Sequence, residues 1–334
     1  MGSLGNVLVV DREPGIRDLI HRVLQKEGYV VREAACAVEA EEVARRNPLD
    51  LIILDRSLPD GDGLKLVQKV SEGFPEVSTL VMTGYGTPEV VLESFRAGAG
   101  GILFKPFYPD ELLASVRESL LRKRQLKELR RNYWSALRVL ARAIDRRDHP
   151  SRDHAGRVAE HAVKIGQRLG LQSGALEELR IGALLHDIGK IELEEYLLEK
   201  RGPLTSQEFE EVKAHPLLGA QILSLAHFPK GVMEVVLYHH ERYDGGGYPF
   251  RLAGEQIPLN ARIVAVAEAF EVMTADRPYA LARTVEEALE ELRQNRGRQF
   301  DPCVVDAFLE VLEEGVRSRE GQEDPCGSSP SKIA

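Results

Sequence analysis

The chain has 334 residues, enough for about two domains that each bury a hydrophobic core. Its 44 basic and 53 acidic side chains give a formal net charge of -9, which argues against a non-specific nucleic-acid binder, because such proteins carry a basic surface. The cysteines form no paired motif, and no stretch has the pattern of a secretion signal or the length of a membrane span, so we expect a soluble protein of the reducing cytoplasm that binds neither DNA nor membranes.

The first third of the chain alternates short apolar runs with amphipathic stretches of helical length. Continuous apolar runs between helices are typical of strands that are buried on both faces. This part therefore predicts an α/β fold, doubly wound around a five-stranded parallel sheet. The runs expected to form its strands are 7–10, 29–31, 51–54, 79–82 and 101–104.

Four of these runs are followed by polar side chains. The functional crevice of a parallel sheet lies at the carboxyl ends of its strands, so these side chains should meet at one edge. They are Asp11, Asp55, Thr83 and Lys105. Here the sequence resembles the receiver domain of two-component response regulators, which is flavodoxin-like in fold. The resemblance implies that Asp55 is the phosphoacceptor for a cognate histidine kinase and that the other three residues form the switch around it.

Arg12 departs from the receiver pattern. Receivers have two adjacent acidic residues after the first strand, whereas this chain reads Asp11-Arg12-Glu13. A guanidinium in place of a carboxylate removes a Mg²⁺ ligand and adds positive charge, which argues against Mg²⁺ binding in the receiver. We therefore expect weak phosphorylation of Asp55 and an output that depends only partly on it. The alternative is a tolerated substitution, in which Glu13 or water supplies the missing ligand.

Helical periodicity begins at Pro109 and continues to about Arg147. In the second half of this stretch apolar positions recur at intervals of three and four residues, as in a coiled coil of about three heptads. These positions are Leu126, Leu129, Tyr133, Leu137, Leu140 and Ile144. The pattern predicts a parallel homodimer along this seam. The alternative is one amphipathic helix that lies on the following domain.

From Ser151 onward helices dominate, and one buried apolar helix leads to His186-Asp187, followed by Gly189 as a natural helix terminator. A buried Asp beside a His is costly without a counter-charge, so we expect a metal ion there. Any one histidine alone would more often be structural, but five more stand in similar settings: His154, His161 shortly after it, His215, His239 and His240. Imidazole and carboxylate ligands suit zinc, iron, manganese or nickel, and a bridging carboxylate would suit a two-metal site for phosphoester cleavage.

A glycine-rich loop, residues 242–249, follows the histidine pair. Three consecutive glycines before Tyr248-Pro249 exclude a helix and provide backbone that can approach a ligand closely. An ordinary flexible connector would also tolerate this composition. The position directly after two candidate ligands favours contact with a substrate or partner.

Together these motifs resemble the HD-GYP family of cyclic di-GMP phosphodiesterases over roughly residues 134–315. The resemblance is carried by His154, His186-Asp187 with Lys190, His215, His239-His240-Glu241, Gly247-Tyr248-Pro249 and Arg277-Pro278-Tyr279. It implies an all-α domain of the HD superfamily that hydrolyses cyclic di-GMP to pGpG or GMP by two-metal phosphodiester cleavage. It also implies that the two divalent ions are iron or manganese rather than zinc.

The same resemblance implies the role of each site residue. The first ion would be held by His154, His186, Asp187 and Glu268, and the second by His215, His239 and His240, with Asp187 as the bridging ligand. Lys190 would pair with a phosphate oxygen, so Asp187 and Lys190 are the expected catalytic residues. The expected substrate-binding residues are Lys190, Arg277, Gly247, Tyr248 and Pro249.

Two positions depart from the HD-GYP pattern. Glu268 stands where the family has an Asp after Val-Ala, and Ala280 stands where a basic residue often follows the Tyr. Together with Arg12 they keep an alternative open, a catalytically weak regulatory module that binds nucleotide or a diguanylate cyclase. A different HD-superfamily hydrolase, such as a nucleotide phosphohydrolase, would leave the glycine-rich loop and the histidine pair unexplained.

The predicted organisation has four parts. They are a receiver domain (1–121), a helical linker (122–147), an HD-GYP domain (148–317) and a tail (318–334). The tail is rich in Gly, Ser, Pro and charge and cannot bury enough apolar surface to order, so we expect it to be disordered.

Overall fold

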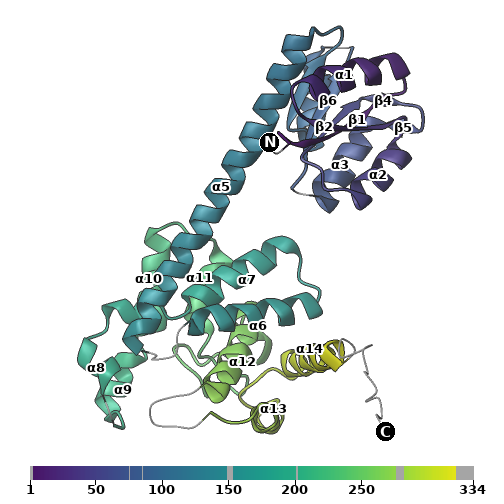
Figure 1. The fold of residues 1–334 in the computed structure, drawn as a ribbon. Coiled ribbons are helices and arrows are strands. Elements are labelled where there is room, and N and C mark those ends of the chain that lie inside the picture. The colour runs from purple at the N-terminus through teal and green to yellow at the C-terminus, as the bar shows by residue number, and fades with distance from the viewer. Residues whose placement is uncertain are drawn as a thin grey trace, which may run out of the picture. The chain divides into compact units, whose positions relative to one another are not determined.

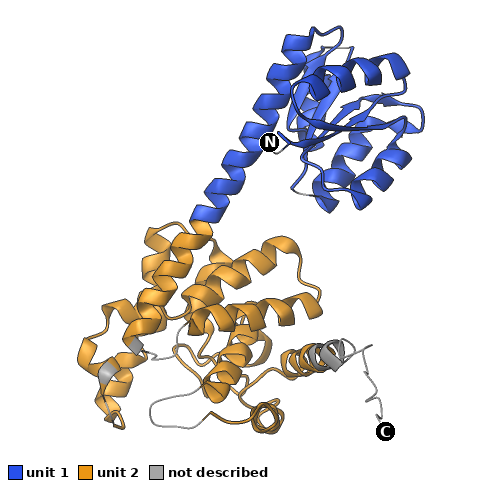
Figure 2. Cartoon of the chain, viewed as in Figure 1, with its two compact units in different colours: residues 1–132 blue, residues 133–334 orange. Residues whose placement is uncertain are grey.

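The computed structural model describes residues 3–74, 76–84, 86–148, 153–200, 202–275 and 282–320. The chain divides into two compact units, residues 1–132 and 133–334 (Figure 2). Helix α5 (Pro109–Asp148) contributes to both units. Across the described ranges, every helix is too short or too polar to cross a membrane. The expected tail lies largely outside the described residues.

The first unit contains the predicted parallel sheet (Figure 1). Its strands follow the order β2-β1-β3-β6-β7. The strands are β1 (Asn6–Val10), β2 (Val30–Ala34), β3 (Leu51–Asp55), β6 (Ser78–Thr83) and β7 (Gly101–Phe104). In register, Val10 lies opposite Leu54, and Asp55 lies opposite Met82. The strand order reverses direction between β1 and β3, where a doubly wound sheet has its crevice. The predicted fold class is confirmed for this unit.

Helices cover both faces of this sheet, as the continuous apolar strands require. Val7 and Val9 pack with residues of α1 (Pro14–Lys26) and α5, whereas Leu8 and Val10 pack with residues of α2 (Ala37–Arg46) and α3 (Gly63–Gly73). Successive strand residues point to opposite faces, so each strand contributes to two cores. The remaining elements are the short strands β4 (Ser57–Leu58) and β5 (Gly61–Asp62) and the helix α4 (Pro88–Arg96).

Helix α5 divides the predicted coiled-coil seam into two sets of residues. Leu137 and Ile144, together with Ala141, are buried in the hydrophobic core of the second unit. Exposed seam positions are Leu126, Leu129, Tyr133 and Leu140. The end of α5 thus packs as an amphipathic helix on the domain that follows it, and the surface open to a second chain is limited to the exposed set.

The second unit is helical, as predicted for an HD-superfamily domain (Figure 1). Its central helices are α6 (His154–Arg168), α7 (Ser173–Leu185), α11 (Lys230–Tyr238) and α12 (Leu259–Thr274), which share one core with the end of α5. The other elements are η1 (Ile188–Glu192), α8 (Glu195–Glu199), α9 (Ser206–Val212), α10 (His215–Leu225), η2 (Gly254–Gln256), α13 (Val285–Gln294) and α14 (Pro302–Glu320).

Gly189 has a different role from the expected helix terminator. Helix α7 ends at Leu185, and Gly189 lies within the 3-10 helix η1. A Cβ atom at Gly189 would lie 1.9 Å from the carbonyl oxygen of His215 and 2.5 Å from the amide of Gly219. The glycine is therefore required because the backbone of η1 lies directly against the first turn of α10.

Candidate metal centre

The candidate histidine ligands lie at helix ends. His154 and His215 are the first residues of α6 and α10, whereas His186 and His239 follow the last residues of α7 and α11. Because each of these helices begins or ends near the centre, several helices can each place a side chain there without their backbones colliding. Four helices that are separate in the sequence thus each bring a histidine to the same region.

Three of these rings are held in the same way. The Nδ1 atoms of His186, His215 and His239 each lie 2.8 Å from the carbonyl oxygen of the residue three positions earlier. A carbonyl can only accept, so each Nδ1 donates a proton to it, and whenever such a ring is neutral its lone pair lies on Nε2. A backbone contact of this kind orients a metal-binding histidine and fixes its tautomer.

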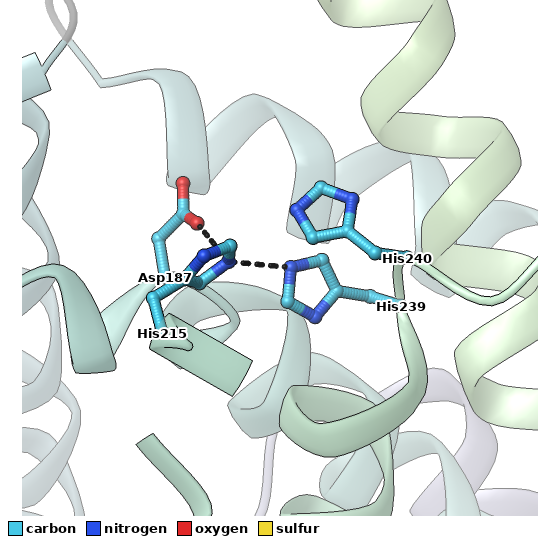
Figure 3. A group of neighbouring side chains, drawn as sticks. All are labelled: Asp187, His215, His239 and His240. Atoms are coloured by element: carbon cyan, nitrogen blue, oxygen red, sulfur yellow. Dashed lines mark hydrogen bonds and ion pairs between the residues drawn. The ribbon is translucent and has the colours of Figure 1, made fainter. Parts of the chain in front are cut away.

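Four side chains form the first group of possible ligands (Figure 3). Asp187, His215, His239 and His240 each offer an atom, and these atoms all lie within 4.8 Å of one another. Asp187 Oδ1 is 3.3 Å from His215 Nε2, which is 3.4 Å from His239 Nε2. Two neutral rings that both donate through Nδ1 have only lone pairs to point at each other. A cation held by both rings would remove that repulsion.

Asp187 also belongs to a second group, with His154 and His186. Its other oxygen, Oδ2, lies 3.2 Å from His186 Nε2 and 2.8 Å from Lys190 Nζ. One carboxylate oxygen thus faces each group, which is the arrangement that a bridging ligand needs.

The donor atoms fit a divalent metal ion. His186 Nε2 and Asp187 Oδ1 are buried, and no described residue outside this cluster makes a hydrogen bond to either atom. Buried polar atoms are rarely left without a partner, because each loses its hydration without compensation. Imidazole nitrogens with a carboxylate oxygen form a ligand set typical of zinc, iron, manganese and nickel.

Burial and neighbouring charges set the protonation of the cluster. Burial lowers the pKa of His215, His239 and His240, which keeps these rings neutral and able to act as ligands. Burial also opposes protonation of His186, but the adjacent Asp187 carboxylate outweighs it and raises that pKa to about 9. Burial would raise the pKa of Asp187, but Lys190 and His186 hold it well below its usual range. The bridging candidate is therefore an anion.

Glu268, the residue that departs from the family pattern, lies in α12. Among the described residues it belongs to neither group of clustered ligand atoms. Burial raises its pKa, and its charge is one cause of the raised pKa of His186, so it lies within electrostatic reach of the centre. Its role as a ligand stays a prediction.

A cavity of about 1000 Å³ opens beside the histidines. Its wall includes His239, His240, Glu268 and the glycine-rich loop with Gly247, Tyr248 and Pro249. The ring of Tyr248 stacks on that of His240, with 4.8 Å between the centroids and 29° between the planes. The cavity is large enough for a dinucleotide-sized ligand, since ligand sites commonly have about 300–1000 Å³.

The glycine-rich loop is held by Glu241, which the sequence analysis assigned no role of its own. This buried side chain accepts hydrogen bonds from the amides of Phe250 at 2.7 Å and Leu252 at 3.1 Å. A Cβ atom at Gly247 would lie 2.4 Å from the amide nitrogen of Arg242. The loop is thus an ordered wall of the cavity rather than a flexible connector.

Another residue that sequence reasoning missed is Glu271, one turn after Glu268 in α12. It is buried, accepts a 2.6 Å hydrogen bond from Arg157 Nε, and lies 3.9 Å from His154 Nδ1. Glu271 follows Glu268 by three residues, and residues three apart lie on the same face of a helix, so this spacing in the sequence already indicated that Glu271 would lie near the centre. Arg277 and Ala280 lie outside the described residues.

In the first unit, the predicted switch residues meet at one edge of the sheet. Lys105 Nζ lies 2.6 Å from Asp11 Oδ2 and 3.0 Å from Asp55 Oδ1, so one ammonium group pairs with both carboxylates. Thr83 is buried at the end of β6. Burial raises the pKa of Asp55 although Lys105 opposes it. Arg12 is exposed to solvent.

Comparison with known proteins identifies both parts of the chain. Residues 7–117 match the response regulator receiver domain, and residues 138–304 match the HD domain. A cyclic di-GMP phosphodiesterase of Thermotoga maritima is 32% identical over 347 residues, which cover 95% of this chain and 94% of that protein. The cyclic di-GMP phosphodiesterase response regulator RpfG of Xanthomonas campestris is 32% identical over 346 residues, covering 96% of this chain and 90% of that protein.

Two further comparisons cover parts of the chain. A 3'3'-cGAMP-specific phosphodiesterase of Vibrio cholerae is 34% identical over 187 residues, which cover 55% of this chain and 36% of that protein. Among solved structures, a CheY-like receiver domain protein of Methanospirillum hungatei is similar to 37% of this chain and 98% of its own, with a TM-score of 0.36 and 32% identity.

Proposed function

Because this chain belongs to the HD-GYP family of cyclic di-GMP phosphodiesterase response regulators, we propose that its helical unit hydrolyses cyclic di-GMP to pGpG or GMP. A receiver domain implies a histidine kinase as its partner. The observation that supports the activity most directly is the pair of ligand groups that share Asp187 beside the cavity. A bridged pair of ions is suited to phosphodiester cleavage.

The proposed division of labour follows from the geometry of the cluster. Two divalent ions would act as Lewis acids on the phosphoryl oxygen and would generate the nucleophile. Asp187 would bridge the two sites, since its two oxygens face different groups. Lys190, held 2.8 Å from Asp187, brings a positive charge to the place where negative charge develops on the phosphate.

The cavity wall supports a nucleotide as the substrate. Tyr248 supplies an aromatic ring already fixed against His240, and Gly247 supplies backbone without a side chain. Basic and acidic residues both line this cavity: Lys213, Arg242, Arg251 and Arg283 with Glu210, Glu241, Glu268 and Glu291. Because Lys213, Arg242 and Arg283 each pair with a nearby acidic residue, the support for a nucleotide comes from the aromatic ring and the open backbone rather than from the charge of the wall. The predicted contact through Arg277 remains part of the proposal.

The identity of the ions is a finer proposal. Nitrogen-rich sites with one carboxylate suit several transition metals, and the family resemblance favours iron or manganese over zinc. Glu268 would complete the group of His154, His186 and Asp187, with its carboxylate one methylene further from the backbone than that of an Asp. In the receiver we propose weak binding of Mg²⁺, because Lys105 pairs with both acidic residues and Arg12 adds a second positive charge nearby.

We also propose a parallel homodimer through α5. The exposed apolar residues Leu126, Leu129, Tyr133 and Leu140 recur at seam spacing, and an exposed apolar stripe of this kind is typical of an interaction surface.

Metal analysis and nucleotide turnover by the purified chain test the proposed function. We expect two metal ions per chain and hydrolysis of cyclic di-GMP, with 3'3'-cGAMP as the comparison substrate because several relatives are named for it. Lys190→Met should retain the metals and lower turnover strongly, to a small but measurable residual rate. If the wild-type chain binds metal and nucleotide without turnover, the hydrolase proposal fails. That result would favour a regulatory module that binds nucleotide or a diguanylate cyclase.

A further inference from the structure

The last turn of α5 lies between two backbone segments of the metal centre. One segment is the first turn of α6, which begins with His154, and the other is η1, which contains Lys190. Asp145 contacts the first segment and Arg147 contacts the second. Residues two positions apart on a helix point to nearly opposite sides, so one helical turn reaches both segments at once.

Arg147 binds the carbonyl groups at the end of η1. Its Nη1 donates to the carbonyl oxygens of Ile191 at 2.8 Å and Lys190 at 3.3 Å, and its Nη2 donates to that of Leu193 at 3.0 Å. The last carbonyls of a helical turn lack partners within it, and a planar guanidinium can serve several of them in a fixed geometry. Arg147 therefore fixes the backbone that carries the ammonium group of Lys190.

Asp145 performs the corresponding task at α6. Within the described part of the chain, the N-cap residue Asp153 has a left-handed backbone and forms no side-chain cap hydrogen bond. Instead, the buried Oδ2 of Asp145 accepts a hydrogen bond from the amide of Ala155 at 3.2 Å. A carboxylate at a helix N-terminus satisfies a free amide and interacts favourably with the helix dipole. This contact holds the turn in which His154 is the first residue.

We propose that Asp145 and Arg147 are positioning residues, which hold His154 and Lys190 in register with Asp187. The catalytic part of this inference rests on the proposed phosphodiesterase function. The turn is itself anchored, because Leu137, Ala141 and Ile144 of the same helix are buried in the core of the unit.

A double-substitution experiment tests whether Arg147 acts through Lys190. Arg147→Met should lower kcat by on the order of tenfold to a hundredfold, as expected when a catalytic group is displaced by a fraction of its reach. In a Lys190→Met background the same change should have almost no further effect. Arg147→Lys keeps the positive charge but lacks the planar guanidinium that donates to several carbonyl groups, so the decrease in kcat should be intermediate. Arg146→Met, at the exposed neighbouring position, is the matched control and should leave kcat unchanged.

Amide hydrogen exchange provides a readout that does not depend on turnover. Arg147→Met should accelerate exchange at residues 188–193, and Asp145→Ala should accelerate it in the first turn of α6, whereas Asp145→Asn keeps an accepting oxygen and should resemble the wild type. Circular dichroism identifies any variant that fails to fold, in which case Arg147→Lys and Asp145→Asn carry the test.

The two proposals can fail separately. If the wild-type chain does not hydrolyse the nucleotide but the exchange pattern is as expected, the enzymatic proposal fails and the positioning contacts stand. If the wild-type chain is active, and Arg147→Met changes neither kcat nor exchange at 188–193, the positioning inference is overturned. Equal fold losses in kcat with and without Lys190 would likewise overturn it.

Discussion

Asp187 is the residue on which both ligand groups depend. Its two oxygens face different histidines, and its negative charge is maintained by Lys190 and His186 against the effect of burial. We predict that Asp187→Asn reduces the bound metal from two ions per chain to less than one, because an amide is a weaker ligand for both sites. Mass spectrometry of metal content checks this. Tyr248→Phe, which alters the cavity but neither ligand group, should retain both ions.

Retention of two ions by Asp187→Asn would contradict the bridging role. A single remaining ion would show that one group holds its metal without the shared carboxylate.

A second prediction concerns the effect of Arg12 on phosphorylation of Asp55. Phosphorylation of Asp55 requires neutralisation of the acidic edge, and there Lys105 already pairs with Asp11 and Asp55. We expect little modification of the wild-type chain by acetyl phosphate with Mg²⁺, and clear modification of Arg12→Asp, because the new carboxylate restores a ligand for the ion. Intact-mass measurement checks this, with Asp55→Asn in the Arg12→Asp chain as the control. Prompt stoichiometric modification of the wild type would refute the prediction.

Helix α5 combines two features along its length, an exposed apolar stripe and an end that is buried in a hydrophobic core. The C-terminal end of α5 is part of the core of the second unit. A shortened chain that starts at Ser151 would therefore lose buried core residues as well as the seam, and its oligomeric state would not report on the seam alone. Single substitutions on the exposed stripe avoid that problem. The stripe residues Leu126 and Leu129 have 62% and 67% of their surface exposed.

We predict that Leu126→Lys combined with Leu129→Lys converts a dimer to a monomer. Burial of each leucine side chain in a dimer interface would contribute up to roughly 1.5–3 kcal/mol to association. A lysine at the same position loses this contribution and places an ammonium group in the seam, which opposes association. Light scattering at micromolar concentration measures the mass. Leu121→Lys, exposed on the same helix but outside the seam, should remain dimeric. A wild-type chain that is monomeric under these conditions would mean that α5 serves only as a packing helix.

The described residues of the molecule form separate hydrophobic cores, two against the faces of the sheet and one in the helical unit. Units with separate cores can unfold separately, and a ligand stabilises only the unit that binds it. When the free metal concentration is a hundredfold above the dissociation constant, binding raises the free energy of unfolding of that unit by about 2.7 kcal/mol.

We therefore predict two thermal transitions, of which chelation lowers only one. Differential scanning calorimetry with and without a chelator measures both Tm values. In Asp187→Asn neither transition should respond to the chelator, because its metal sites are already disrupted. A shift of both transitions in the wild type would show that the two units unfold together or that each binds metal.

The sequence by itself determined the fold class and the identity of most candidate ligands. The apolar runs before Asp11 and Asp55 are long enough to indicate strands buried on both faces, and the structure has the parallel sheet that they predict. His154, His186, His215, His239 and His240 stand in motifs of recognisable spacing. Such signals are local, because the period of a strand or helix and the neighbours of a ligand are written in consecutive residues.

Only the tertiary structure decided which of these residues meet. It divides the candidate histidine ligands into two groups that share Asp187, and it buries Leu137 and Ile144 of a seam that the periodicity assigned to a dimer. Asp145 and Arg147 were invisible as site residues because their partners are carbonyl and amide groups, which every residue carries. Contacts of this kind depend on how separate helices pack, and no local pattern in the sequence records them.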